Sequence, residues 1–157
     1  MDYPHYDLKV STDSTIFEFI SSGKQGNICK IIKFTITKNP DIINLGFGDK
    51  INSNEKNGTF DIDDVNITDN GDRNIVLATV ANATYIYTEV YPDKFIFFYG
   101  SCKIRTRLYR MAISSNYDEL IKTFLIFGIL QNHETGNYYN VTFNSSKNFV
   151  GFLIKRK

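Results

Sequence analysis

The sequence predicts an α+β fold: a bent antiparallel sheet of about six or seven strands with two helices packed on one face. Short segments rich in β-branched and aromatic residues, separated by turn sequences, occupy both ends of the chain. Two longer segments between them repeat apolar residues at helical spacing. With 157 residues, 42% of them hydrophobic, the chain can bury one core. We therefore expect a single domain over residues 1–157, with residues 1–13 as a loose N-terminal segment.

The N-terminal strands are expected at residues 14–21, 28–37 and 42–47. Apolar and polar residues roughly alternate in the first two segments, and β-branched residues are frequent in the second. The segment between them, residues 22–27, contains Ser, Gly and Asn, which favour a tight turn. These features predict a hairpin followed by a third strand.

Residues 48–70 are polar and rich in turn formers, so the sequence predicts a long loop with a short strand near residues 60–65. The loop carries the acidic residues Asp61, Asp63 and Asp64. The segment after them imitates the start of a calcium-binding loop, but Leu77 stands where such a loop needs a bidentate carboxylate. We therefore expect a solvated loop, and neither a metal ion nor a cofactor.

The first helix is expected to begin at Asn70 as the N-cap and to end before Pro92. Its apolar stripe recurs at spacings of three and four residues and comprises Val76, Val80, Ala83, Tyr87 and Val90. An amphipathic helix is stabilised mainly by burying such a stripe, so we expect Val76 and Val80 to be buried.

A strand at residues 94–99 precedes the second helix, which is expected to run from about residue 103 to residue 124. The helix has a comparable apolar stripe, and we expect its members Tyr109, Ile113 and Leu120 to be buried. Residues 114–116 favour a bend, because the Ser-x-x-Asp sequence at 115–118 is typical of a capping box.

The last third of the chain is expected to return to β-structure. Strands are predicted at residues 125–130, 138–143 and 149–154, and the segments between them contain Gly, Asn and Ser. Together with the earlier elements they complete the α+β pattern.

Several classes of protein are excluded or disfavoured by composition. The formal net charge is only +1, which argues against a protein that is basic throughout, although a local basic patch is compatible with it. The first residues have neither the basic start nor the apolar segment of a signal peptide, so none is expected, and no apolar run reaches the roughly 20 residues that span a membrane. A cytoplasmic protein that does not enter the membrane is therefore expected. The only cysteines, Cys29 and Cys102, are too far apart in sequence to suggest a zinc motif.

Four segments carry a resemblance to a known family: residues 44–49 (NLGFGD), 70–73 (NGDR), 76–81 (VLATVA) and 100–109 (GSCKIRTRLY). In this combination the chain resembles a family of small, uncharacterised, single-domain bacterial proteins. The resemblance covers most of residues 16–125 and implies a single intracellular domain. It implies no activity, because the family has none established.

The strongest functional signal is basic. Lys103, Arg105, Arg107 and Arg110 place four cations within eight residues, directly after Gly100-Ser101 at the expected end of a strand. A strand-to-helix turn exposes backbone N–H groups, and the helix dipole there favours an anion. Lys103, Arg107 and Arg110 fall within about 60° on a helix, whereas Arg105 points to a different side, beside Tyr109.

These residues support two hypotheses. The first is a non-catalytic binding or regulatory module that uses Ser101, Lys103, Arg105, Arg107, Tyr109 and Arg110 to engage a nucleic acid, a phosphate-bearing ligand or an acidic protein. The second is a small enzyme acting on nucleic acid or nucleotides, such as a toxin nuclease that relies on Arg and Tyr109 in place of His. We expect Arg105 to pair with an acid, with Asp72 and Asp49 as the candidates, and Arg107 and Arg110 to be accessible to solvent.

Overall fold

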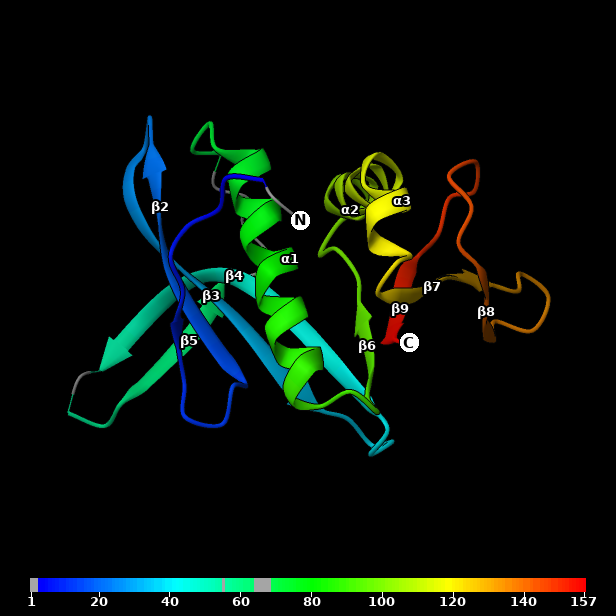
Figure 1. Ribbon diagram of the computed structural model, residues 1–157, viewed down its shortest axis with the longest axis horizontal. Helices are drawn as coiled ribbons and strands as arrows, with labels where there is room; N and C mark the ends of the chain where they lie inside the picture. The colour runs from blue at the N-terminus through cyan, green and yellow to red at the C-terminus, as the bar shows by residue number, and fades with distance from the viewer. Residues whose placement is uncertain (1–2, 55, 64–68) are drawn as a thin grey trace. The chain divides into compact units, whose positions relative to one another are not determined.

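The computed structural model describes residues 3–54, 56–63 and 69–157, and Figure 1 shows how the chain runs through them. These residues contain nine strands and three helices. In chain order the elements are β1 (Lys9–Val10), β2 (Ile16–Gly23), β3 (Gly26–Ile36), β4 (Ile42–Asn54), β5 (Thr59–Asp63), α1 (Arg73–Val90), β6 (Phe95–Phe98), α2 (Lys103–Ser115), α3 (Tyr117–Leu120), β7 (Phe124–Gln131), β8 (Tyr138–Thr142) and β9 (Gly151–Arg156).

The strands form a mixed, mostly antiparallel sheet in the order β1-β2-β3-β4-β6-β9-β7-β8, with β5 added to β4. The pairing of β4 with β6 is parallel. The α+β class is therefore confirmed, and the sheet has nine strands where six or seven were expected. By its internal contacts the chain divides into two compact units: unit 1 is Met1–Thr35 with Leu45–Val90, and unit 2 is Ile36–Asn44 with Tyr91–Lys157.

In unit 1 the predicted N-terminal hairpin is confirmed. β2 pairs with β3 from Ile16↔Lys33 to Gly23↔Gly26, and Gly26 has the positive φ of 87° that the tight turn requires. Within the segment expected to be loose, β1 pairs with β2, and the Tyr6 N–H donates to the Thr79 hydroxyl at 2.9 Å.

The buried face of α1 differs from the predicted stripe. Val76 and Val80 are only half-buried, so their predicted burial is wrong, and Val90 at the end of the stripe is 51% exposed. Ala83 and Tyr87 of the predicted stripe are buried, and the other buried residues of the helix are Ala78, Thr79, Thr84 and Thr88.

Threonine explains the shift of the buried face of α1. The Thr84 hydroxyl donates to Val80 O at 2.9 Å and the Thr88 hydroxyl to Thr84 O at 2.8 Å, so buried hydroxyls find acceptors within the helix itself. Small side chains also let the helix approach its neighbours closely, and Tyr87 stacks on Phe34 of β3 with ring centroids 4.1 Å apart.

The predicted long loop at residues 48–70 is partly a hairpin. β4 continues to Asn54 and pairs with β5, from Asp49↔Asp63 to Asn54↔Thr59, with an irregularity between Ile51 and Asn54. Residues 51–54 are exposed, so this hairpin has no apolar face at its tip to reveal it in the sequence. The expected short strand near residues 60–65 corresponds to β5, and Asp64 lies outside the described residues.

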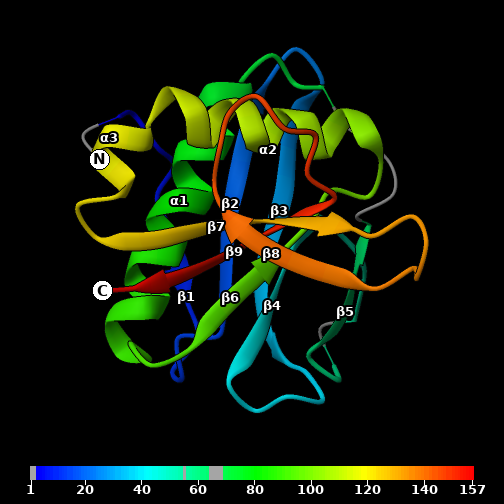
Figure 2. The ribbon, with the colours of Figure 1, turned by 90° about the vertical axis from the view of Figure 1, so that its right-hand side faces the viewer.

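Unit 2 contains the C-terminal strands, which lie side by side in Figure 2. Antiparallel pairing joins β6 to β9, β9 to β7 and β7 to β8. The core of this unit is mostly aromatic and aliphatic, and its buried residues include Ile96, Ile113, Phe124, Ile126, Phe143, Phe149, Phe152 and Ile154.

The second predicted helix is two helices. α2 ends at Ser115, and Asn116 separates the two helices. The Asn116 N–H and its side-chain amide both donate to Ala112 O, at 3.2 and 2.8 Å. The expected bend is confirmed, but Asn116 rather than Ser115 occupies the N-cap of α3, so the capping box is wrong. Ile113 is buried as predicted, whereas Tyr109 and Leu120 are half-buried. No helix within the described residues is long and apolar enough to cross a membrane.

Candidate functional site

The turn between β6 and α2 is held in one conformation by Thr106. The Gly100 N–H donates to the Thr106 hydroxyl at 3.1 Å, and that hydroxyl lies 3.1 Å from the Cys102 carbonyl oxygen, to which it donates. A Cβ atom on Gly100 would lie 2.3 Å from the Thr106 backbone nitrogen, so the close approach requires glycine here. The turn is therefore preorganised by the chain itself.

The N-terminus of α2 carries positive charge that its own sequence does not offset. The Thr106 N–H donates to Cys102 O at 3.1 Å and opens the helical ladder, so the N–H groups of residues 103–105 precede that ladder. Within the described residues, the Cys102 side chain at the N-cap makes no capping hydrogen bond, and the first turn contains no acidic residue. The helix dipole and the nearby cations thus act in the same direction and favour an anion.

The predicted site residues separate into exposed and packed groups. Ser101, Lys103 and Arg107 are exposed. Arg105 and Tyr109 are half-buried, and the Tyr109 ring packs edge-on against Phe98 of β6 with centroids 5.8 Å apart.

Arg110 behaves differently from the expectation that it is freely accessible. It is half-buried, and its guanidinium donates to the Lys147 carbonyl at 3.2 Å and to the Asn148 side-chain oxygen. A loop from the C-terminal third thus holds this side chain. The exposed surface formed by Ser101, Lys103 and Arg107 is called the basic turn below.

Two exposed apolar residues of α2 lie outside the predicted site. Ile104 is 67% exposed and Met111 is 49% exposed. They are seven residues apart, so they lie on one helix face, adjacent to Arg107. Their exposure could have been predicted from the sequence, because both residues lie outside the apolar stripe that contains Tyr109 and Ile113. The exposed side of α2 therefore combines cations with aliphatic side chains.

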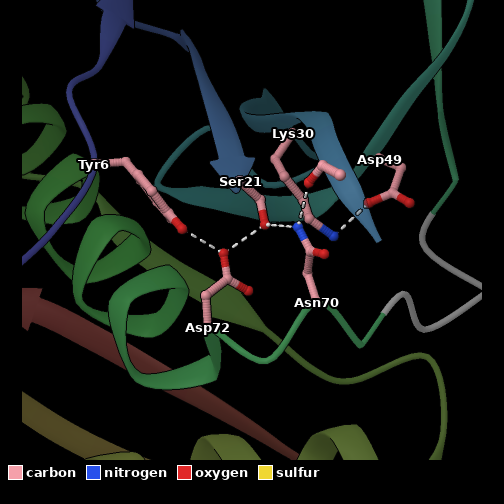
Figure 3. Close-up of polar contacts among 7 residues, drawn as sticks. Tyr6, Ser21, Lys30, Asp49, Asn70 and Asp72 are labelled. Atoms are coloured by element: carbon pink, nitrogen blue, oxygen red, sulfur yellow. Dashed lines mark hydrogen bonds and ion pairs between the residues drawn. The ribbon is translucent and has the colours of Figure 1, made fainter. Parts of the chain in front are cut away.

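Unit 1 contains a second polar cluster, built around Asn70 (Figure 3). Asn70 is 2% exposed, and its amide nitrogen donates to the Ser21 hydroxyl at 3.0 Å and to Gly26 O at 2.9 Å. Its side-chain oxygen accepts from the Gln25 N–H at 2.6 Å. Asn70 is therefore not the predicted N-cap, because its side chain closes the β2–β3 turn instead.

Asp72 takes the place expected for Asn70 at the start of α1. Its carbonyl accepts the Val76 N–H at 3.0 Å, and its carboxylate accepts hydrogen bonds from Tyr6 at 2.6 Å and Ser21 at 2.5 Å. Asp72 is thus engaged within unit 1, and its predicted pairing with Arg105 stays a prediction. Burial, and next the hydrogen bond to Asp72, raise the pKa of the Tyr6 hydroxyl above its usual value.

A buried ion pair lies close to this cluster in Figure 3. Lys30 Nζ is 2.5 Å from the Asp49 carboxylate, and their side chains are only 7% and 17% exposed. Lys30 also lies over the Phe47 ring, 5.9 Å from its centroid. The predicted pairing of Arg105 with Asp49 stays a prediction.

The buried polar groups of unit 1 form hydrogen bonds with one another. Every fully buried side-chain nitrogen or oxygen in the described residues has a hydrogen-bond partner, so these groups stabilise one another. The described residues contain no group of three or more His, Cys, Asp or Glu placed to hold a metal ion. Burial, followed by the nearby Glu18 charge, raises the pKa of the Cys29 thiol and disfavours its reactive thiolate.

Fold and surface together define an α+β protein with a mostly antiparallel sheet, a structural polar cluster and an exposed basic turn. The chain belongs to a family of unknown function, DUF6934, whose model matches residues 2–157. The match extends beyond the residues 16–125 that carried the initial resemblance. No curated protein and no solved structure matches the chain.

Proposed function

We propose that this protein is a non-catalytic binding or regulatory module whose basic turn engages an anionic group of a ligand or partner. One observation carries the proposal: a locked turn places the uncapped N-terminus of α2 beside the exposed cations Lys103 and Arg107. A preorganised site loses little conformational entropy when it binds, which favours recognition. The bacterial and cytoplasmic setting stays a prediction from the sequence.

Each part of the basic turn has a distinct role in this proposal. The backbone N–H groups of Lys103 and Ile104 and the Ser101 hydroxyl donate hydrogen bonds to the anion. Arg107 supplies a planar guanidinium that matches phosphate or carboxylate, and Lys103 supplies a point charge. Arg110 adds positive charge next to the basic turn and does not bind the anion directly, because its guanidinium is hydrogen-bonded to Lys147 and Asn148.

Binding is favoured over the enzyme alternative by the position of Tyr109. A nuclease that lacks a nearby His would need this phenol at the reacting atoms. The Tyr109 ring instead packs against Phe98, which serves the attachment of α2 to β6. The enzyme alternative would be supported if the wild-type protein hydrolysed RNA or nucleotides and the Tyr109→Phe variant did not.

The test is a comparison of two labelled polyanions, a single-stranded DNA oligonucleotide and a polyglutamate peptide, by fluorescence anisotropy across a salt series. The proposal predicts saturable binding of at least one probe by the wild-type protein. In Lys103→Ala/Arg107→Ala the affinity for that probe should fall. If the probe is DNA, the slope of log affinity against log salt should shrink by about 1.4, the value expected for two lost phosphate contacts.

The matched control is Lys38→Ala, which removes an exposed cation of the same unit from the turn between β3 and β4. It should leave both affinity and salt dependence unchanged. Equal losses in the control and in the double variant would mean that the probes sense overall charge, and the proposal would be wrong.

A further inference from the structure

β8 forms an open edge of the sheet. It stands last in the strand order, and no strand of the described chain pairs with its outer side. Edge strands in soluble proteins are usually protected by charges, proline or bulges. β8 reads Tyr-Tyr-Asn-Val-Thr, and its register with β7 is regular from Phe127↔Thr142 to Gln131↔Tyr138. It therefore has none of these protections.

The hydrogen bonds at both ends of the β7–β8 ladder show which backbone groups face outward. The Phe143 N–H donates to Ile126 O at 3.0 Å, and the Asn132 N–H donates to Asn137 O at 2.8 Å. In an antiparallel ladder the hydrogen-bonded pairs alternate with non-bonded ones, so the bonded pairs between these ends are Gly128–Val141 and Leu130–Tyr139.

The remaining residues of β8 are Tyr138, Asn140 and Thr142. Their N–H and C=O groups therefore point away from β7, toward the open edge. These are three consecutive positions at which another strand can add a hydrogen-bonded pair. The side chains nearby are also uncovered, since Tyr138 is 66% exposed and Tyr139 is 48% exposed.

We propose that β8 pairs with β8 of a second copy of this chain, antiparallel, about a two-fold axis at Asn140. In this register Asn140 faces its own copy, and Tyr138 faces Thr142 of the other chain. All three are outward-facing residues, so every such pair can exchange both backbone hydrogen bonds. Tyr139 then faces Val141 in the non-bonded positions between them.

The sequence of β8 is complementary to itself in this arrangement. Each tyrosine meets a β-branched residue, a favourable cross-strand combination. The strand carries no charge, so self-pairing brings no like charges together, whereas an acidic or basic partner strand would find no counter-charge. A closed two-fold contact also covers the β8 edge of both copies, so the association does not continue beyond a dimer.

The test measures the mass of the wild-type protein by analytical ultracentrifugation from micromolar to millimolar concentration. The weight-average mass should rise from 18.1 kDa toward twice that value and no further. Amide hydrogen exchange at Asn140 should slow over the same range. A mass that stays at the monomer value, or that rises without limit, would overturn the proposal.

Two variants locate the contact. Asn140→Pro removes one outward N–H and leaves the bonded pairs with β7 intact. Asn140→Lys places two like charges on the axis and keeps the backbone unchanged, so it serves if the proline variant fails to fold. Each should weaken the dimer by about tenfold or more. His133→Lys adds a charge in the turn before β8 and should dimerise normally; dimers that persist in both Asn140 variants would refute the contact.

Discussion

Replacement of Asn70 by alanine tests whether the polar cluster of unit 1 is structural. The buried Asn70 amide makes three hydrogen bonds, to Ser21, Gly26 and Gln25, at 3.0, 2.9 and 2.6 Å. Asn70→Ala removes all three at once. Ser21 is 0% exposed, so its hydroxyl would lose a partner that water cannot replace without rearrangement.

The expected magnitude follows from these contacts. Each hydrogen bond contributes about 1 kcal/mol net, and the buried Ser21 oxygen loses its donor while the hydroxyl keeps its hydrogen bond to Asp72. Gly26 and Gln25 are exposed, so water satisfies them in the variant. We therefore expect Asn70→Ala to lower the free energy of unfolding by about 2–4 kcal/mol.

Urea denaturation followed by circular dichroism measures this change as a shift of the midpoint with an unchanged slope. Asn27→Ala is the matched control in the same hairpin, because Asn27 is exposed and accepts one hydrogen bond from Ser22 at 3.0 Å. It should cost less than about 1 kcal/mol. Equal, small losses in both variants would refute the structural role assigned to Asn70.

Three further predictions concern substitutions in unit 1 and in the core of unit 2. Asp49→Ala should cost about 3–5 kcal/mol by leaving Lys30 buried without its partner, and adding Lys30→Met should recover most of that loss in denaturation experiments. The raised pKa of Tyr6 means that its ionisation opposes folding: its stabilising effect is complete below pH 10.0 and is lost as the pH rises through the folded pKa. The difference in unfolding free energy between wild type and Tyr6→Phe should therefore be constant near neutral pH and shrink in alkaline titrations. Gly128→Ala places a Cβ atom 2.3 Å from the Phe149 ring and should lower the melting temperature, with partial rescue by Phe149→Ala.

Local patterns in the sequence were sufficient to predict most elements of the fold. The β2–β3 hairpin followed from alternation and from turn residues between two β-branched segments. The bend at residues 114–116 was predicted from a Ser-x-x-Asp capping box at 115–118, and the helix does end there although Asn116 occupies the N-cap. Both depend on neighbours in sequence, which a single chain displays directly.

Features that depend on distant partners could not be predicted in the same way. Asn70 was interpreted as an N-cap, whereas its side chain bonds to Ser21, 49 positions away. The buried face of α1 was misassigned because Thr84 and Thr88 count as polar in a periodicity argument until their hydroxyls find carbonyls inside the helix.

The candidate site shows the same division. Helical periodicity placed Arg105 and Arg107 on different sides of α2, and the structure has the first half-buried and the second exposed. The restraint on Arg110 was not predictable, because it depends on Lys147 and Asn148, which are 37 and 38 positions away.

The most direct test of the basic turn is a residue-resolved titration with inorganic phosphate, followed by amide chemical shifts in NMR spectra. The account predicts saturable shifts that are largest at residues 101–105, weaken as salt is added, and disappear in Lys103→Ala/Arg107→Ala while Lys38→Ala retains them. Shifts of equal size at exposed cations elsewhere, such as Lys24 and Lys122, would contradict the central claim that this turn is the anion-binding surface of the protein.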